Sequence, residues 1–104
     1  MDVITLLDEI TADADGTAYK VGDYRLVNGP IAFLVYGDNI SATVNIQGTI
    51  ATDAEVTAGT APFRTINGGS FTEEAATALV AQFSHIRGQV TSYSSGTVSL
   101  RMLI

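Results

Sequence analysis

The stretch IRGQVTSYSSGTVSLRMLI, residues 86–104, decides the fold class. Apolar residues or glycine occupy the even positions from Ile86 to Val90 and again from Val98 to Ile104, while most odd positions are polar. A period of two is typical of β-strands that bury one face. The pattern therefore predicts two strands whose even-numbered side chains point inward.

A three-residue turn is expected between these two strands. Partners across a hairpin share a face, so the joining loop must have an odd length. Ser94-Ser95-Gly96 fits, with Gly96 in the left-handed conformation that such a loop requires. We therefore expect a hairpin with these opposed pairs: Val90 with Leu100, Gln89 with Arg101, and Thr91 with Ser99.

A second hairpin is expected upstream, where IAFLVY (31–36) meets ISATVNIQGTI (40–50) through Gly37-Asp38-Asn39. The later strand is expected to bury Ile40, Ala42, Val44 and Ile46 and to show Ser41, Thr43, Asn45 and Gln47. A two-residue loop would place Ile31, Phe33 and Val35 inside and Ala32, Leu34 and Tyr36 outside, and a three-residue loop would exchange the two sets. In both cases an apolar triplet lies on the outer face, covered by the chain itself or by a neighbouring molecule.

The pattern predicts a single all-β domain over residues 1–104. Its expected architecture is an antiparallel β-sandwich, jelly-roll-like, with about eight strands. Only residues 70–83 carry a helical signal. Ser70 and Glu73 match a capping box, but the alternation of apolar residues from Leu79 to Phe83 favours a strand. We expect at most one short helical turn near residues 71–76. The expected turns are 12–16, 21–23, 28–30, 37–39, 53–60, 67–70 and 94–96.

Composition excludes several function classes. The 104 residues carry a net charge of −6, and the five basic residues are scattered, so a nucleic-acid partner and an anionic membrane are not expected. Cysteine is absent, and charged residues make up 15% of the chain against about 25% in average soluble domains. The start, MDVITLLDEIT, shows no export signal, so Met1 is expected to begin the mature protein.

Candidate chemistry is sparse. His85 has no nucleophile elbow or second histidine beside it, so it reads as a packed or surface strand residue. Asp13-Ala14-Asp15-Gly16 resembles the opening of a calcium loop, but the closing glutamate is missing. We therefore expect no enzyme activity, no catalytic residue, no cofactor and no metal ligand. The remaining candidates are explained by capping and turns: Glu73 with Glu74, Asp38 with Asp53, and Asn67-Gly68-Gly69-Ser70.

Four tyrosines offer a different possibility. Tyr19, Tyr24, Tyr36 and Tyr93 could stack on sugar rings if they were exposed together. They would then form a glycan- or receptor-binding module of a larger assembly. Loss of sugar binding on Tyr93→Ala would favour that alternative.

Two motifs resemble a known protein group. FSHIRGQVTSYSSGTVSLRMLI (83–104) is similar to the C-terminal strands of small β-sandwich or jelly-roll virion proteins of tailed bacteriophages, where an arginine-bearing strand leads into a T-x-Y-x-S-G-T-V turn. ISATVNIQGTIATDAEV (40–56) resembles the strand of these modules that ends in Gln-Gly-Thr and an acidic loop. The matching turn residues are Arg87, Tyr93, Ser95, Gly96 and Thr97, whereas residues 1–28 match weakly.

The resemblance implies a capsid decoration (cement) protein, or else a tail or adaptor component. Such a structural viral protein would be made in the host cytoplasm and would reside in the virion, on the capsid surface. It would form a homo-oligomer, with trimers common, and bind the lattice of the major capsid protein. The contact residues that we expect are Ala32, Leu34, Tyr36, Thr43, Asn45, Gln89 and Arg101.

Overall fold

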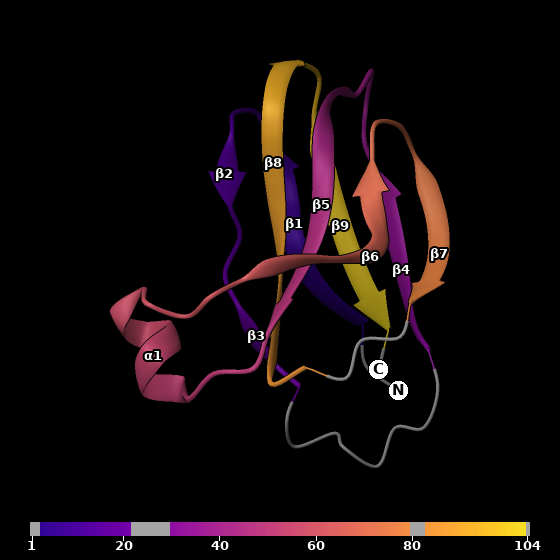
Figure 1. Cartoon of the computed structure of the whole chain (residues 1–104). Coiled ribbons are helices and arrows are strands. Elements are labelled where there is room, and N and C mark those ends of the chain that lie inside the picture. Colours follow the sequence, from indigo (N-terminus) through magenta and orange to yellow (C-terminus); the bar gives the residue numbers. More distant parts are fainter. Residues whose placement is uncertain (1–2, 22–29, 80–82, 104) are drawn as a thin grey trace.

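The computed structural model describes residues 3–21, 30–79 and 83–103, which form two facing antiparallel sheets (Figure 1). Sheet A has the strand order β1-β9-β4-β7, and sheet B has the order β2-β8-β5-β6 with β3 also pairing with β8. The elements are β1 (Val3–Ile10), β2 (Ala14–Asp15), β3 (Tyr19–Lys20), β4 (Ile31–Tyr36), β5 (Ser41–Thr49), α1 (Asp53–Ala58), β6 (Arg64–Phe71), β7 (Ala75–Leu79), β8 (His85–Ser95) and β9 (Val98–Leu103).

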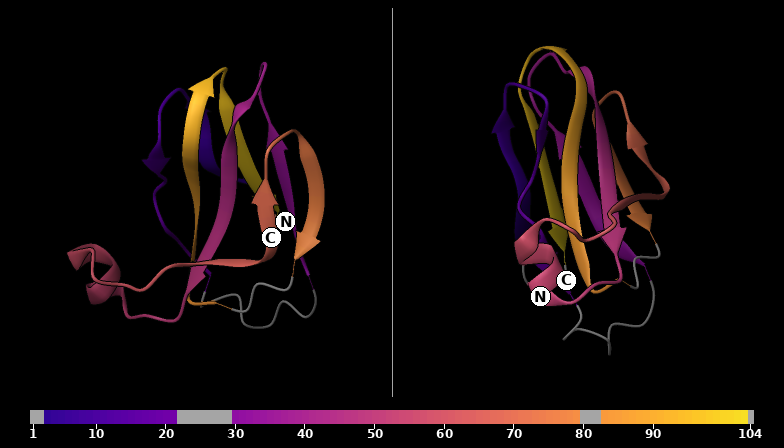
Figure 2. Two further views of the ribbon diagram at one scale, coloured as in Figure 1. Left: turned by 45° about the horizontal axis from the view of Figure 1, so that its top comes forward. Right: turned by 60° about the vertical axis from the view of Figure 1, so that its left-hand side comes forward.

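The order of the strands is that of a jelly roll. Four connections lie at one end of the sandwich, at the top of Figure 1, and each crosses from one sheet to the other: β1 to β2, β4 to β5, β6 to β7, and β8 to β9. The views in Figure 2 show the two layers and these crossings from other sides. The predicted all-β sandwich is therefore confirmed.

The two predicted hairpins are wrong, because the two strands of each lie in different sheets and do not pair. The predicted inward-facing side of each strand is nevertheless correct. β8 pairs with β5 and β2, whereas β9 pairs with β1 and β4. Val90 therefore lies opposite Val44, and Leu100 lies opposite Val35, not opposite each other. Facing strands of a sandwich both point their even side chains inward, as hairpin partners would, so alternation alone cannot tell the two arrangements apart.

The two crossings from β4 to β5 and from β8 to β9 stack directly on each other. The Thr97 N–H donates to the Asp38 carbonyl oxygen at 3.0 Å, and the Asp38 N–H donates to Thr97 Oγ1 at 3.1 Å. Gly96 has a φ of 88°, as the sequence predicted, and an added Cβ there would overlap the carbonyl oxygens of Asp38 and Asn39. Close stacking of the crossings therefore requires glycine at this position.

The core fills the space between the sheets with the predicted even-numbered side chains. Ile86 and Val90 of β8 face Val98, Leu100 and Met102 of β9, and all five are at most 1% exposed. On β4 and β5 the buried set corresponds to the first of the two predicted alternatives. It consists of Ile31, Phe33, Val35, Ala42, Val44 and Ile46.

The short helix lies elsewhere than predicted. Residues 71–76 contain the end of β6 and the start of β7, whereas α1 occupies part of the expected turn 53–60. Thr52 caps α1, because its side chain accepts from the Glu55 N–H while the Glu55 carboxylate accepts from the Thr52 N–H. The expected turn at 67–70 lies inside β6, where Gly68 has a φ of 81°. The turns expected at 21–23 and 28–30 lie mostly outside the described residues.

None of the helical structure in the described ranges is long and apolar enough to cross a membrane.

Candidate functional site

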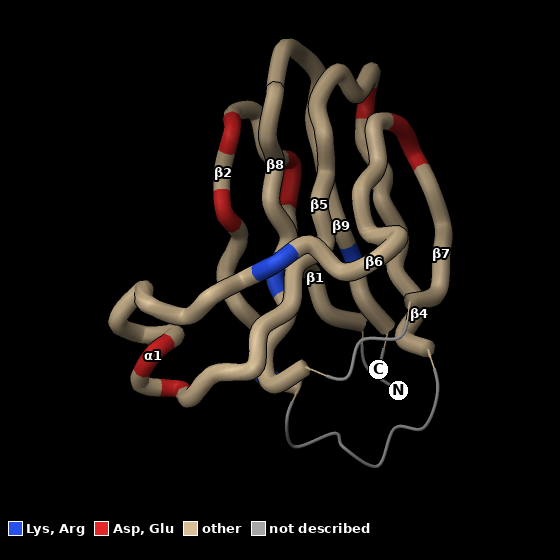
Figure 3. Tube along the Cα trace, viewed as in Figure 1, with Lys and Arg blue, Asp and Glu red and all other residues tan. Residues whose placement is uncertain are grey.

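The outer face of sheet A carries two rows of exposed side chains that cross all four strands. One row is apolar and joins Val3, Leu103, Ala32 and Ala78. The next row joins Thr5, Arg101, Leu34 and Ala76. We call these eight residues the outer apolar face, because only Arg101 among them is charged. Figure 3 shows acidic residues at β2, at α1, in the end connections and at the end of β1, where Asp8 and Glu9 lie beyond these two rows, and none along β4 or β7.

The large side chains of this face are open to solvent. The exposed fractions are 62% for Val3, 43% for Leu34 and 39% for Leu103. The expected outward placement of an apolar triplet is confirmed for Ala32 and Leu34, which are exposed, while Tyr36 is half-buried. Contiguous exposed apolar residues on a monomer usually mark an interaction surface.

A shallow groove of about 350 Å³ adjoins the outer apolar face at the end where the crossings lie. Its lining contains Tyr36 and Arg101, and the Arg101 guanidinium lies 5.1 Å from the centroid of the Tyr36 ring. The rest of the lining is largely acidic, with Asp8, Glu9, Asp38 and Glu74. The groove combines an aromatic ring with hydrogen-bonding carboxylates, which are groups that can bind polar ligands.

The outer face of sheet B carries a network of amide side chains. Gln89 is its centre: its Oε1 accepts from Asn45 Nδ2 at 3.1 Å and from Gln47 Nε2 at 3.2 Å, and its Nε2 donates to Asp15 Oδ1 at 2.9 Å. Arg87 extends the network, because its Nε donates to Gln47 Oε1 and its guanidinium lies 4.1 Å from the Phe63 ring centroid. Gln47 is only 7% exposed, so the prediction that it is displayed on the surface is wrong.

The seven predicted contact residues divide between the two sheets. Arg101 belongs to the outer face of sheet A, and Gln89 lies on sheet B across the sandwich from it. The first group is Ala32, Leu34, Tyr36 and Arg101, and the second is Thr43, Asn45 and Gln89. One flat surface cannot contain both groups. The sequence did not indicate Val3, because the consecutive buried residues Leu6 and Leu7 interrupt the alternation along β1. The odd position of Leu103 already indicated its outward direction.

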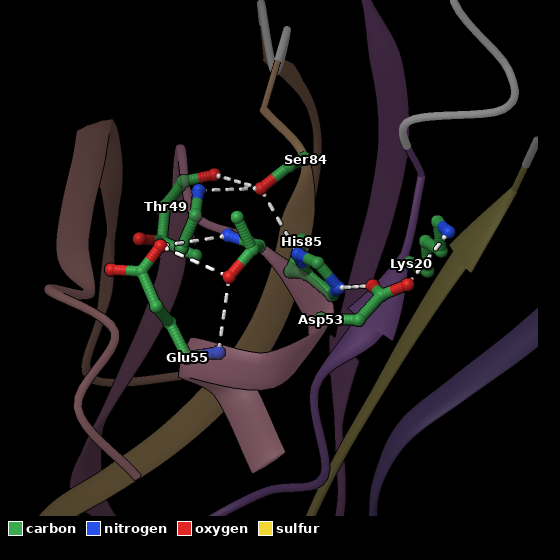
Figure 4. Close-up of polar contacts among 8 residues, drawn as sticks. Lys20, Thr49, Asp53, Glu55, Ser84 and His85 are labelled. Atoms are coloured by element: carbon green, nitrogen blue, oxygen red, sulfur yellow. Dashed lines mark hydrogen bonds and ion pairs between the residues drawn. The ribbon is translucent and has the colours of Figure 1, made fainter. Parts of the chain in front are cut away.

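His85 is buried and links β8 to the segment around α1 (Figure 4). Its Nε2 lies 2.9 Å from Asp53 Oδ1, and its Nδ1 lies 3.0 Å from Ser84 Oγ. Asp53 also accepts from Lys20 Nζ at 2.9 Å. These hydrogen bonds, from Lys20 first and His85 second, hold the pKa of Asp53 below its usual value.

The serine, histidine and aspartate contacts are better explained by anchoring than by nucleophilic catalysis. The Ser84 hydroxyl donates to the Thr49 carbonyl oxygen at 3.0 Å and accepts from the Ala51 N–H at 2.9 Å. A nucleophile needs its proton directed at the histidine, but this hydroxyl is occupied with backbone groups. The cluster fastens the start of the long β5–β6 connection to β8.

The acidic candidates also have structural partners. Asp13 Oδ1 accepts from the Tyr93 N–H at 2.8 Å, and Asp15 accepts from Gln89, so both carboxylates fasten β2 to β8. Across the described ranges no group of three or more acidic or histidine residues is arranged to hold a metal ion. Asp38 and Asp53 flank opposite ends of the nine-residue strand β5, too far apart to act on one bond.

The tyrosines do not gather into one platform. Tyr19 and Tyr93 pack against the core, and the Tyr93 hydroxyl donates to the Gly96 carbonyl oxygen at 2.7 Å. Tyr36 lies in the groove beside sheet A, and Tyr24 is outside the described residues. Among the tyrosines in the described ranges, only Tyr36 lines this groove with its acidic residues.

Comparison of the chain with protein-family models, with curated proteins and with solved structures finds no match.

Proposed function

We propose that this protein is a non-enzymatic structural component of a tailed-bacteriophage virion, a decoration protein that self-associates and stabilises the capsid. The observation that carries the proposal is the outer apolar face, whose leucine and valine side chains stand in solvent. Binding of such a face to an assembled shell releases the ordered water around it, at roughly 25 cal/mol per Å² of apolar surface buried. The resemblance of residues 40–56 and 83–104 supplies the viral context.

Binding only to the assembled shell would stabilise the shell. A ligand that binds one state of a protein and not the other shifts the equilibrium towards the bound state. The jelly-roll sandwich suits this role, since both sheets are held by long-range strand pairing and the outer face of sheet A is left for contacts. The low charge of the outer apolar face also fits a protein partner better than a nucleic acid.

Incorporation into particles tests the proposal. Particles purified by density gradient from the phage lysate should contain the chain, and Leu34→Asp should remove it from them, because a carboxylate at the centre of an apolar contact loses its hydration. Ser41→Asp is the matched control, since it adds the same charge at an exposed position on sheet B. Thermal unfolding of both variants verifies that they fold. Particles that lack the wild-type chain would contradict the proposal.

A glycan- or receptor-binding module is the second candidate, and the groove around Tyr36 favours it. A sugar ring could lie on Tyr36 if Arg101 moved from the ring face, while Asp38 and Glu74 accepted hydroxyl protons. Tyr36→Ala is the informative variant here, because Tyr93 packs against the core. Binding to a sugar array that disappears in Tyr36→Ala would support this function over capsid decoration.

A further inference from the structure

Most edges of the two sheets are protected against pairing with another chain, as sheet edges usually are. β1 has two breaks in its register with β9, and Glu9 within it has a φ of 47°. β2 and β3 contain two residues each. β6 has a register break opposite β5 and begins with a charged residue, Arg64.

β7 is the exception. It pairs with β4 over five consecutive residues, from Leu79 opposite Ile31 to Ala75 opposite Val35, with no register break. The strand AATAL contains no charge and no proline, and Ala76 and Ala78 are exposed. It lies at the margin of the sandwich in Figure 1, and no described strand pairs with its other side. Its outward N–H and C=O groups can therefore receive another strand.

We propose that β7 pairs antiparallel with β7 of a second copy, around a two-fold axis at Thr77. This inference rests on the proposed function and names the partner in self-association. The register centred on Thr77 is the one that pairs all five residues of both strands. It places Ala76 opposite Ala78, Ala75 opposite Leu79 and Thr77 opposite Thr77 of the second copy, so every pair away from the axis contains an alanine.

A second copy fits this edge because the pairing continues the outer apolar face. The row Val3, Leu103, Ala32 and Ala78 would run on into Ala76 and Leu34 of the second copy. Sheet A of one copy and sheet A of the other would join into one continuous sheet. Its two central strands, both β7, contain no charged residue. The contact is isologous, so it closes after two copies and does not propagate into a fibre.

Cysteine cross-linking tests the register, since the chain contains no cysteine of its own. Residues directly opposite in antiparallel strands have Cα atoms about 4.5–5.5 Å apart, within the range of a disulfide. An equimolar mixture of Ala76→Cys and Ala78→Cys protein should form a disulfide-linked dimer on mild oxidation. Each variant alone should cross-link several-fold less, because its cysteine faces an alanine of the second copy.

A charge variant provides an independent measurement. Ala76→Lys with Ala78→Lys would place lysines opposite each other and should turn the dimer into a monomer in native mass spectrometry at micromolar concentration. Ala76→Lys alone, which leaves alanine opposite the lysine, should weaken the dimer less.

The outcomes separate this inference from the proposed function. A wild-type monomer, a trimer as the resemblance implies, or a mixture that does not cross-link would overturn the β7 pairing. Any of these results together with Leu34-dependent incorporation into particles would leave capsid decoration standing, although a wild-type monomer would remove self-association from the proposed function. If the cysteine variants cross-link as expected but the wild-type chain is absent from the particles, the decoration function is overturned and the β7 pairing is not.

Discussion

Two glycines, Gly96 and Gly59, have left-handed backbones but different surroundings, so an added side chain should lower stability by different amounts. Gly96 has a φ of 88° and lies against the backbone oxygens of the β4–β5 crossing, whereas Gly59 has a φ of 75° at the end of α1 with nothing within 4 Å of an added Cβ. The two positions share the conformational requirement and differ only in packing.

Alanine at these positions should therefore have unequal effects on stability. Gly59→Ala should lower the free energy of unfolding by roughly 1–2 kcal/mol, the cost of the left-handed conformation alone. Gly96→Ala should cost more, because its Cβ overlaps Asp38 and Asn39 backbone atoms and the crossings must separate. Urea denaturation of both variants measures the difference. Equal losses would show that the crossings are not tightly stacked.

The lowered pKa of Asp53 predicts a dependence of stability on pH. The hydrogen bonds from Lys20 and His85 favour its carboxylate in the folded state, so the unfolded chain binds the proton more readily. The stability from this group is complete above the unfolded pKa, about 3.9, and is lost as the pH falls through the lower folded pKa. The difference in unfolding free energy between wild type and Asp53→Asn should be larger at pH 7 than at pH 2.5. An unchanged difference would contradict this assignment.

At the level of elements, β9 shows the two faces of sheet A within one strand. Leu100 is fully buried between the sheets, and Leu103 is 39% exposed on the outer apolar face. Leu100→Ala should lower the free energy of unfolding by about 2–5 kcal/mol through lost burial and a residual cavity. Leu103→Ala should change it by less than about 0.5 kcal/mol, as surface substitutions usually do. Thermal or urea unfolding of the pair checks this, and comparable losses would mean that Leu103 is covered.

The sequence predicted the faces of the strands because burial imposes a period of two on β8, β9, β4 and β5. It did not predict which strands pair, because Val90 and Leu100 point inward whether they are neighbours in one sheet or face each other across two. Pairing depends on distant segments such as Val44 and Leu7, and no local pattern encodes these contacts.

The helix was misplaced for a different reason. Two capping-box patterns compete, Thr52 with Glu55 and Ser70 with Glu73, and only the first starts a helix. The second is drawn into β-structure by tertiary pairing, since Ser70 lies opposite Asn45 and its hydroxyl donates to the Asn45 side chain at 2.9 Å. The His85 cluster was missed because Asp53 and His85 are 32 residues apart, and only the fold brings them together.

For the whole molecule, the net charge of −6 opposes association of copies. Two acids, Glu73 and Glu74, immediately precede β7, so repulsion acts close to the proposed pairing edge. Salt screens such repulsion, with a Debye length of about 10 Å at 0.1 M. The dimer dissociation constant should therefore fall as sodium chloride rises from low to physiological concentration, as measured by sedimentation. A rise in that constant would indicate a contact held by opposite charges.

The pairing of Val3 with Leu103 brings the first and last described residues of the chain together on neighbouring strands β1 and β9. A short peptide linker could join the ends, and new termini could be opened elsewhere, as in circular permutation. Peptides fused at either end would both emerge at the end of the sandwich opposite the four crossings (Figure 1). The protein could thus display two cargoes side by side without disturbing those crossings.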